Sequence, residues 1–258
     1  MKNIINDLRQ LKKLGAVAIK QSLEDEGAGF KDLALMRKIT KKIGLKLNVK
    51  IGGCEAKNDI HFCNFIKVDT IVAPMVESDY ALRKFIQTIP KTFKGDLFIN
   101  LETKNAFYNL KKILNCKEFN KLKGVVIGRS DLAGSYNLSK PMVDSYKIYK
   151  ILDKNLTKIK TKKKIIKMGG SITKYSKDFI KKLFKKKLIN RIETRNIELK
   201  LNNNVIKNLE MIISLIFNFE IDWLKFKNKN FKLDQISKKT NLKRIFEIDN
   251  RLKKKDLY

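Results

Sequence analysis

Short, β-branched apolar runs alternate along this chain with longer segments of helical period, and this alternation restricts the fold more than any other feature. It is typical of βα units, in which parallel strands form one sheet and the intervening helices cover it. The predicted strands are Ala16–Leu23, Leu47–Gly52, Thr70–Val76, Leu97–Thr103, Gly124–Gly128, Ile165–Met168 and Arg191–Leu199. The predicted helices span roughly 31–43, 57–66, 78–88, 104–114, 142–153, 176–187 and 204–225.

A closed barrel and a doubly wound open sheet both accommodate this pattern. The length of 258 residues matches the roughly 250 residues of a (β/α)8 TIM barrel, and this is the fold we predict. Seven strands are visible where such a barrel has eight, so one strand is irregular or hidden. We assign residues 1–225 to the barrel and residues 226–258 to a basic helical C-terminal extension, entered through a linker-like stretch at 226–234.

Composition narrows the class of protein. Hydrophobic residues make up 43% of the chain, which excludes general disorder. The longest apolar run, Met211–Phe219, falls short of the roughly 20 residues that span a bilayer. The first 15 residues lack the apolar stretch of a secretory signal, so we expect a cytoplasmic protein without a membrane partner. Cys54, Cys63 and Cys116 have no CxxC spacing and predict neither a disulfide framework nor a zinc site.

The net charge of +32 first suggests a nucleic-acid partner. The excess is almost all lysine and accompanies abundant Ile and Asn, three residues with A/T-rich codons. The basic runs, such as KTKKK at 160–164, are scattered over several predicted helices, and no nucleic-acid-binding motif accompanies them. We therefore interpret the charge mainly as a compositional background that also attracts anionic substrates.

Acidic residues gather at the ends of the predicted strands, although the chain as a whole is poor in them. Glu102 and Asp131 end consecutive strands, one βα unit apart, so in a barrel both carboxylates would face the same mouth. Hard oxygen ligands of this kind suit Mg²⁺ or Mn²⁺. Two ordinary strand-end acids, with Asp131 capping the following helix, would give the same pattern.

Five short blocks between Gly15 and Tyr136 resemble the HpcH/HpaI aldolase and citrate lyase β-subunit family of metal-dependent 2-oxo-acid lyases. Two of these blocks contain Glu102 and Asp131, which the resemblance identifies as the family's metal-binding glutamate and aspartate. The blocks cover about half of the chain. They are LEDEG at 23–27, VKIGG at 49–53, VAPMVES at 72–78, INLET at 99–103 and VIGRSDLAGS at 126–135.

The chain departs from the family pattern at three positions. Lys50 stands where the pyruvate aldolases carry an arginine, and a lysine is a point charge rather than a bidentate fork. Glu26 replaces the histidine base of those enzymes, and Arg129 stands where many members have proline. The single histidine, His61, falls in a predicted helix, where we interpret it as a structural residue rather than a catalyst.

The resemblance implies a carbon–carbon lyase in which a divalent metal stabilises the enolate of a 2-oxo acid or acyl-CoA. Lys50 would neutralise substrate charge, Glu26 would move the proton, and Arg129 would hold a second anionic group. The GGSIT segment at 169–173 is a candidate phosphate cradle, although a tight turn explains it equally well. The candidate substrate-binding residues are Lys20, Gly128, Ser130, Gly169, Gly170 and Arg195.

Two other functions compete with the lyase. A non-catalytic barrel that binds a carboxylate or phosphate ligand would explain why the family's arginine and histidine are missing. A nucleic-acid or anionic-surface binder would use the charge of +32. For the lyase we expect a small anionic substrate, Mg²⁺ or Mn²⁺ as cofactor, and a homo-oligomer of the kind formed by members of the family.

Overall fold

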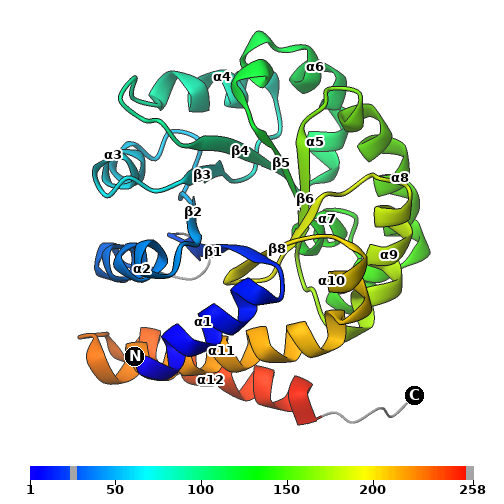
Figure 1. Ribbon diagram of the computed structural model, residues 1–258. Helices are drawn as coiled ribbons and strands as arrows, with labels where there is room; N and C mark the ends of the chain where they lie inside the picture. Colours follow the sequence, from blue (N-terminus) through cyan, green and yellow to red (C-terminus); the bar gives the residue numbers. More distant parts are fainter. Residues whose placement is uncertain (24–27, 254–258) are drawn as a thin grey trace.

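The computed structural model describes residues 1–23 and 28–253, in which eight strands form one closed barrel with helices outside it (Figure 1). Each strand pairs with the next along the chain, and β8 closes the ring against β1. The predicted TIM-barrel architecture is therefore confirmed. The strands are β1 (Ala16–Ser22), β2 (Lys46–Lys50), β3 (Thr70–Ala73), β4 (Asp96–Leu101), β5 (Gly124–Gly128), β6 (Ile165–Gly169), β7 (Arg191–Glu193) and β8 (Ile197–Lys200).

The last strand differs from a regular (β/α)8 barrel. Strands β1 to β7 pair in parallel, whereas β8 runs antiparallel to both β7 and β1. The predicted single strand Arg191–Leu199 is in fact a hairpin, and this hairpin supplies the missing eighth strand. Its turn is closed by Thr194, whose backbone N–H donates to the Ile197 carbonyl at 2.9 Å and whose hydroxyl accepts from the Ile197 N–H at 3.2 Å.

Most helices lie near their predicted positions, although α7 (Arg129–Ser135) was not predicted and the helix predicted at 142–153 spans Tyr146–Lys160. An additional helix precedes the first strand, and the predicted segments 104–114 and 204–225 are each divided into two helices. The α-helices are α1 (Lys2–Lys13), α2 (Phe30–Ile43), α3 (Lys57–Phe65), α4 (Asp79–Thr88), α5 (Lys104–Tyr108), α6 (Leu110–Asn115), α7 (Arg129–Ser135), α8 (Tyr146–Lys160), α9 (Lys177–Lys185), α10 (Asn203–Lys207), α11 (Leu209–Asn230) and α12 (Gln235–Lys253). Short 3-10 helices span Lys117–Lys121 (η1), Lys140–Asp144 (η2) and Lys174–Ser176 (η3).

Local capping explains where several helices begin. The hydroxyls of Ser78 and Thr103 accept hydrogen bonds from backbone N–H groups in the first turns of α4 and α5. The Asn202 side chain does the same for α10. Helix α2 ends at Gly44, which takes the left-handed conformation (φ +68°) that favours glycine. These caps fix the points at which the loops of the barrel leave the strands.

Helices α1, α11 and α12 pack side by side on one flank of the barrel (Figure 1). Helix α11 continues to Asn230, so the segment predicted as a linker at 226–234 is helical over its first half. An ion pair between Lys227 and Asp32 (Nζ–Oδ2 2.5 Å) joins the last turns of α11 to α2, and both side chains are buried. Helix α12 returns along α11, where Arg244 donates to the buried Glu220 carboxylate at 2.7 Å.

The barrel has two hydrophobic regions. The larger lies between the strands and the surrounding helices, and a small one, made of Val72, Phe98 and Val126, fills part of the barrel interior. Polar residues complete the interior, since Lys167 on β6 pairs with the fully buried Glu198 on β8 at 2.6 Å. In the part of the chain that the structure describes, no helix is both long and apolar enough to cross a bilayer.

Candidate active site

The carboxyl ends of strands β1 to β7 open at one end of the barrel, which we call the mouth. In TIM barrels the loops at this end carry the functional residues, because every strand delivers its last side chains there. Glu102 follows β4, and Asp131 lies in the first turn of the helix that follows β5. Both acids therefore lie at the mouth, as the sequence predicts.

Glu102 is buried and held from two sides. Its Oε1 accepts the backbone N–H of Met75 at 3.0 Å, and its Oε2 accepts the side-chain amide of Asn100 at 2.8 Å. Met75 adopts φ +49°, an uncommon conformation for a residue with a side chain. The loop after β3 thus takes a strained turn at the residue whose N–H contacts the carboxylate.

Burial raises the pKa of Glu102 above its ordinary value. The hydrogen bond from Met75 and the positive charge of Lys50 lower this pKa, and the negative charge of Asp131 raises it. Lys50 and Asp131 are therefore both close enough to Glu102 to influence its ionisation. A buried carboxylate with a second acid nearby is an arrangement that a cation stabilises.

Gly128, at the end of β5, makes room for Glu102. A Cβ at this position would lie 2.3 Å from Glu102 Oε2 and 2.8 Å from its Cβ, so any side chain here would displace the carboxylate. Asp131 itself is exposed, and Gly128 rather than Asp131 is the N-cap of α7. Asp131 therefore does not cap the helix that follows β5, as one interpretation of the sequence suggested.

The two candidate lysines of the mouth differ in their surroundings. Lys50 is 5% exposed and ends β2. Lys20, on β1, forms an ion pair with the buried Glu193 of β7 (Nζ–Oε1 3.1 Å). These residues bring positive charge to the same end of the barrel as Glu102.

Two buried polar atoms at the mouth have no hydrogen-bond partner among the described residues. They are the Oδ1 of Asn100, whose amide holds Glu102, and the hydroxyl oxygen of Ser22 at the end of β1. Buried oxygen atoms without a partner are costly unless something else occupies them. The unpartnered Asn100 oxygen, on a side chain that contacts the Glu102 carboxylate, fits a site that takes up a cation or a polar ligand.

Arg129 is fully buried and braces the loop after β6. Its Nε donates to the Gly169 carbonyl at 3.1 Å, its Nη2 donates to the Gly170 carbonyl at 2.9 Å, and its Nη1 pairs with Asp144. This close packing requires a glycine at position 170. A Cβ there would lie 2.5 Å from the Ser130 nitrogen, and the φ angle is +80°. With these contacts Arg129 positions the loop rather than facing an open site.

A cavity of about 280 Å³ opens beside this loop and contains four of the predicted substrate-binding residues, namely Lys20, Ser130, Gly170 and Arg195. The remaining two, Gly128 and Gly169, are buried strand ends that pack against Glu102 and Glu193. The cavity is also lined by residues that the sequence interpretation missed, among them Lys140, Arg244 and Arg251. The rarity of arginine could have pointed to Arg244 and Arg251, because the chain has only 8 arginines among its 58 basic residues.

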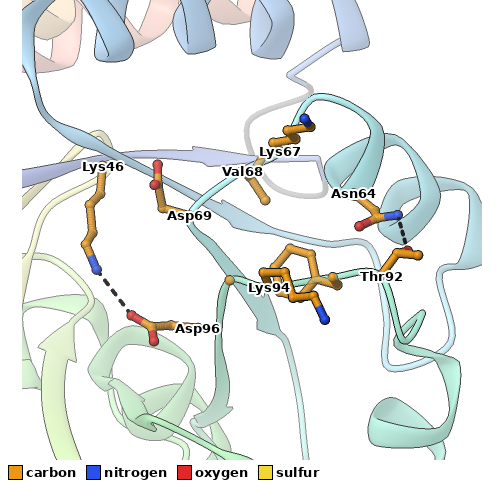
Figure 2. Close-up of a pocket in the computed structure, with 10 residues that line it drawn as sticks. Lys46, Asn64, Lys67, Val68, Asp69, Thr92, Lys94 and Asp96 are labelled. Atoms are coloured by element: carbon orange, nitrogen blue, oxygen red, sulfur yellow. Dashed lines mark hydrogen bonds and ion pairs between the residues drawn. The ribbon is translucent and has the colours of Figure 1, made fainter.

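A wider hollow of about 590 Å³ lies at the opposite end of the barrel (Figure 2). It is lined by residues at or before the starts of strands, such as Lys46 of β2 and Asp96 of β4, which pair at 3.3 Å. Residues at this end of a TIM barrel serve stability rather than chemistry. Despite its size, we do not place the functional site there.

Two sequence predictions fall elsewhere. Glu26, the candidate proton carrier, lies outside the described residues, as do the other residues of 24–27. His61 is exposed on α3. Within the described residues no group of three or more His, Cys, Asp or Glu side chains is arranged to hold a metal.

Comparison with known proteins adds a likeness of structure. No family model matches the sequence, and no curated protein matches it either. An HpcH/HpaI aldolase from Desulfitobacterium hafniense DCB-2 has a similar solved structure, with a TM-score of 0.58 at 11% identity over 68% of this chain and 75% of that one. The chain shares the fold of this aldolase.

Two further solved structures show the same likeness. A HpcH/HpaI aldolase/citrate lyase family protein from Burkholderia cenocepacia J2315 has a TM-score of 0.56 at 11% identity, over 68% of this chain and 77% of that one. The citrate synthase SbnG has a TM-score of 0.57 at 10% identity, over 74% and 80% of the two chains. Identities this low establish the common fold, while the function has to be argued from the site.

Proposed function

We propose that this protein is a divalent-metal-dependent carbon–carbon lyase that acts on a 2-oxo acid or an acyl-CoA. The observation that carries the proposal is the placement of Glu102 and Asp131 at the mouth of the barrel, with Lys50 close to the buried Glu102 carboxylate. The fold supports it, because HpcH/HpaI aldolase structures share this fold. The substrate would be a small anion, in keeping with the cations around the mouth.

The residues at the mouth fit Mg²⁺ or Mn²⁺. Glu102 and Asp131 offer hard carboxylate oxygens, and Asn100 adds a buried amide oxygen without a partner among the described residues. Glu102 already has its orientation fixed by Met75 and Asn100, as the supporting contacts of a metal ligand require. When bound, such an ion would supply a Lewis acid for the oxygens of the substrate.

The protein's own side chains have separate tasks in this proposal. Lys50 neutralises negative charge on the substrate, and its burial strengthens that interaction by excluding water. Arg129 holds the loop after β6 in place, so that it acts as a positioning residue. The proton would be moved by Glu26, which the sequence places at the end of β1, or by water held there.

Proton exchange tests this function directly. The protein is incubated with pyruvate and Mg²⁺ in D₂O, and loss of the methyl signal is followed by NMR. We expect exchange that depends on the metal and disappears in Glu102→Gln. The matched control is Glu210→Gln, which removes an exposed carboxylate on α11 that pairs with Lys177. This variant should exchange at the normal rate.

A titration with Mn²⁺ examines the metal site without requiring the correct substrate. The calorimetric signal should be lost in Asp131→Asn and retained in Glu210→Gln. If the protein binds Mn²⁺ normally in Asp131→Asn, or if no 2-oxo acid or acyl-CoA undergoes exchange with any divalent metal, the lyase proposal fails. Binding of a carboxylate ligand without exchange would instead favour the non-catalytic barrel.

A further inference from the structure

The C-terminal helix α12 contributes two arginines to the cavity beside the mouth. Arg244 and Arg251 line this cavity together with Lys20, Lys140 and Arg195, so that five cations surround about 280 Å³. Among the described residues, the lining contains one carboxylate, Glu193, which is paired with Lys20. A hollow with this balance of charge attracts an anion.

The positive charge of the cavity is only partly compensated by the protein. Arg244 is paired with Glu220 and lies 3.5 Å from a carboxylate oxygen of Glu247. Within the described residues neither Lys140 nor Arg251 forms an ion pair with a carboxylate. Burial lowers the pKa of Arg251 and the neighbouring charge of Arg244 lowers it further, whereas the charges of Glu247 and Glu220 raise it. An anion between these groups would relieve that repulsion.

The loop after β6 adds backbone features that suit the same ligand. Gly170 and Ser171 both have left-handed φ angles (+80° and +51°), and both line the cavity. Among the described residues, no hydrogen bond uses the backbone N–H of either residue. The loop is held rigidly, because Arg129 binds the Gly169 and Gly170 carbonyls and Ser130 contacts Ser171 (Oγ–Oγ 2.9 Å). Successive backbone N–H groups in a turn can donate to an anion.

We propose that this cavity binds an oxyanion, a phosphate or a carboxylate group, and that α12 completes the site with Arg251. Arginine suits such a ligand because its guanidinium presents two parallel donors to an oxyanion. That the oxyanion is the distal group of the substrate rests on the proposed lyase function. The oxyanion site itself is argued from the cavity alone. Together with the proposed lyase function, it narrows the substrate class to 2-oxo acids or thioesters with a second anionic group.

Calorimetric titration with inorganic phosphate, and separately with malonate, tests the site. It is done without metal or oxo acid and at constant ionic strength, so that the diffuse charge of the surface is screened equally throughout. We expect saturable binding of one anion per chain, weakened about tenfold or more in Arg251→Gln. The stronger of the two probes identifies the kind of group. Arg251→Lys keeps the charge but not the fork, and should bind with intermediate affinity.

The matched control is Lys243→Gln, which removes one positive charge from an exposed position on the same helix. Equal weakening in Lys243→Gln and Arg251→Gln would mean that the anion responds to overall charge, and the proposed site would be refuted. Absence of saturable binding of either probe would refute it as well. Loss of metal-dependent exchange with normal phosphate affinity would count against the lyase function only, so the two failures can be told apart.

Discussion

Replacing Gly128 by alanine should damage the site through a single contact. The added Cβ would lie 2.3 Å from Glu102 Oε2, well inside van der Waals contact, and Glu102 is 2% exposed. The backbone at Gly128 (φ −87°, ψ 93°) is allowed for alanine, so the cost arises from the clash rather than from the backbone.

Two responses to this clash are possible, and both are costly. If Glu102 stays in place, overpacking of this kind costs about 1–3 kcal/mol. If Glu102 moves away, it gives up hydrogen bonds from Met75 and Asn100, each worth about 1.5–3 kcal/mol to a charged acceptor. Replacing glycine stiffens the unfolded chain and returns only about 0.4–1 kcal/mol. Taking the middle of these ranges, we expect the free energy of unfolding to fall by about 1 kcal/mol if Glu102 stays in place, and by more if it moves.

Gly134 provides a matched control within the same stretch of chain. It lies in α7, it is exposed, and a Cβ added there would meet nothing within 4 Å. Gly134→Ala should be more stable than the original protein by about 0.5–1 kcal/mol, because alanine favours a helix. Urea denaturation of both variants measures the difference, and Mn²⁺ titration measures the effect on the metal site. If Gly128→Ala is as stable as Gly134→Ala and binds Mn²⁺ normally, Glu102 is not held as described.

Two further predictions concern buried charges. Because burial raises the pKa of Glu102 above its ordinary 4.5, ionisation of Glu102 should destabilise the metal-free protein. The free energy of unfolding should therefore fall as the pH rises from 4.5 through the raised pKa. Urea denaturation over a pH series should show no such fall in Glu102→Gln, and an identical pH profile in both proteins would contradict this prediction. Lys227→Met should leave Asp32 as a buried, unpaired charge and lower the free energy of unfolding by about 3–5 kcal/mol. The control Lys225→Met, at an exposed position on the same helix, should change it by no more than about 0.5 kcal/mol. Equal effects of the two variants in thermal denaturation would refute the importance of this pair.

Most of the barrel could be predicted because periodicity reports directly on βα units. The strand Gly124–Gly128 has the predicted bounds, and the others begin within one residue of their predicted positions. The eighth strand could not be found, since the turn in Arg191–Leu199 contains neither glycine nor proline and the apolar residues on both sides of it continue a strand-like pattern. The turn is instead closed by Thr194, a residue with no special signature in sequence.

The candidate site could be predicted only as far as it lies on strand ends. Glu102 and Asp131 follow strands, so the fold alone brings them to the mouth. Arg129 shares that position in the sequence, yet its side chain is directed into contacts with Gly169 and Asp144, which depend on how the next loop folds. Arg251 comes from a helix more than a hundred residues later, and no local pattern relates it to the barrel.

The closure of the barrel by β8 has a consequence for biosynthesis. The ring closes only when β8 pairs with β1, so a growing chain cannot form the complete barrel until Lys200 has left the ribosome. Helices α11 and α12 follow this step, so Arg244 and Arg251 of α12 reach the cavity beside the mouth after the ring has closed. Because a domain generally folds as a unit, the barrel with its carboxylate pair would form only once β8 has emerged, and Arg244 and Arg251 would join it when α12 follows. The ability to hold an anion would therefore depend on α12 having emerged from the ribosome.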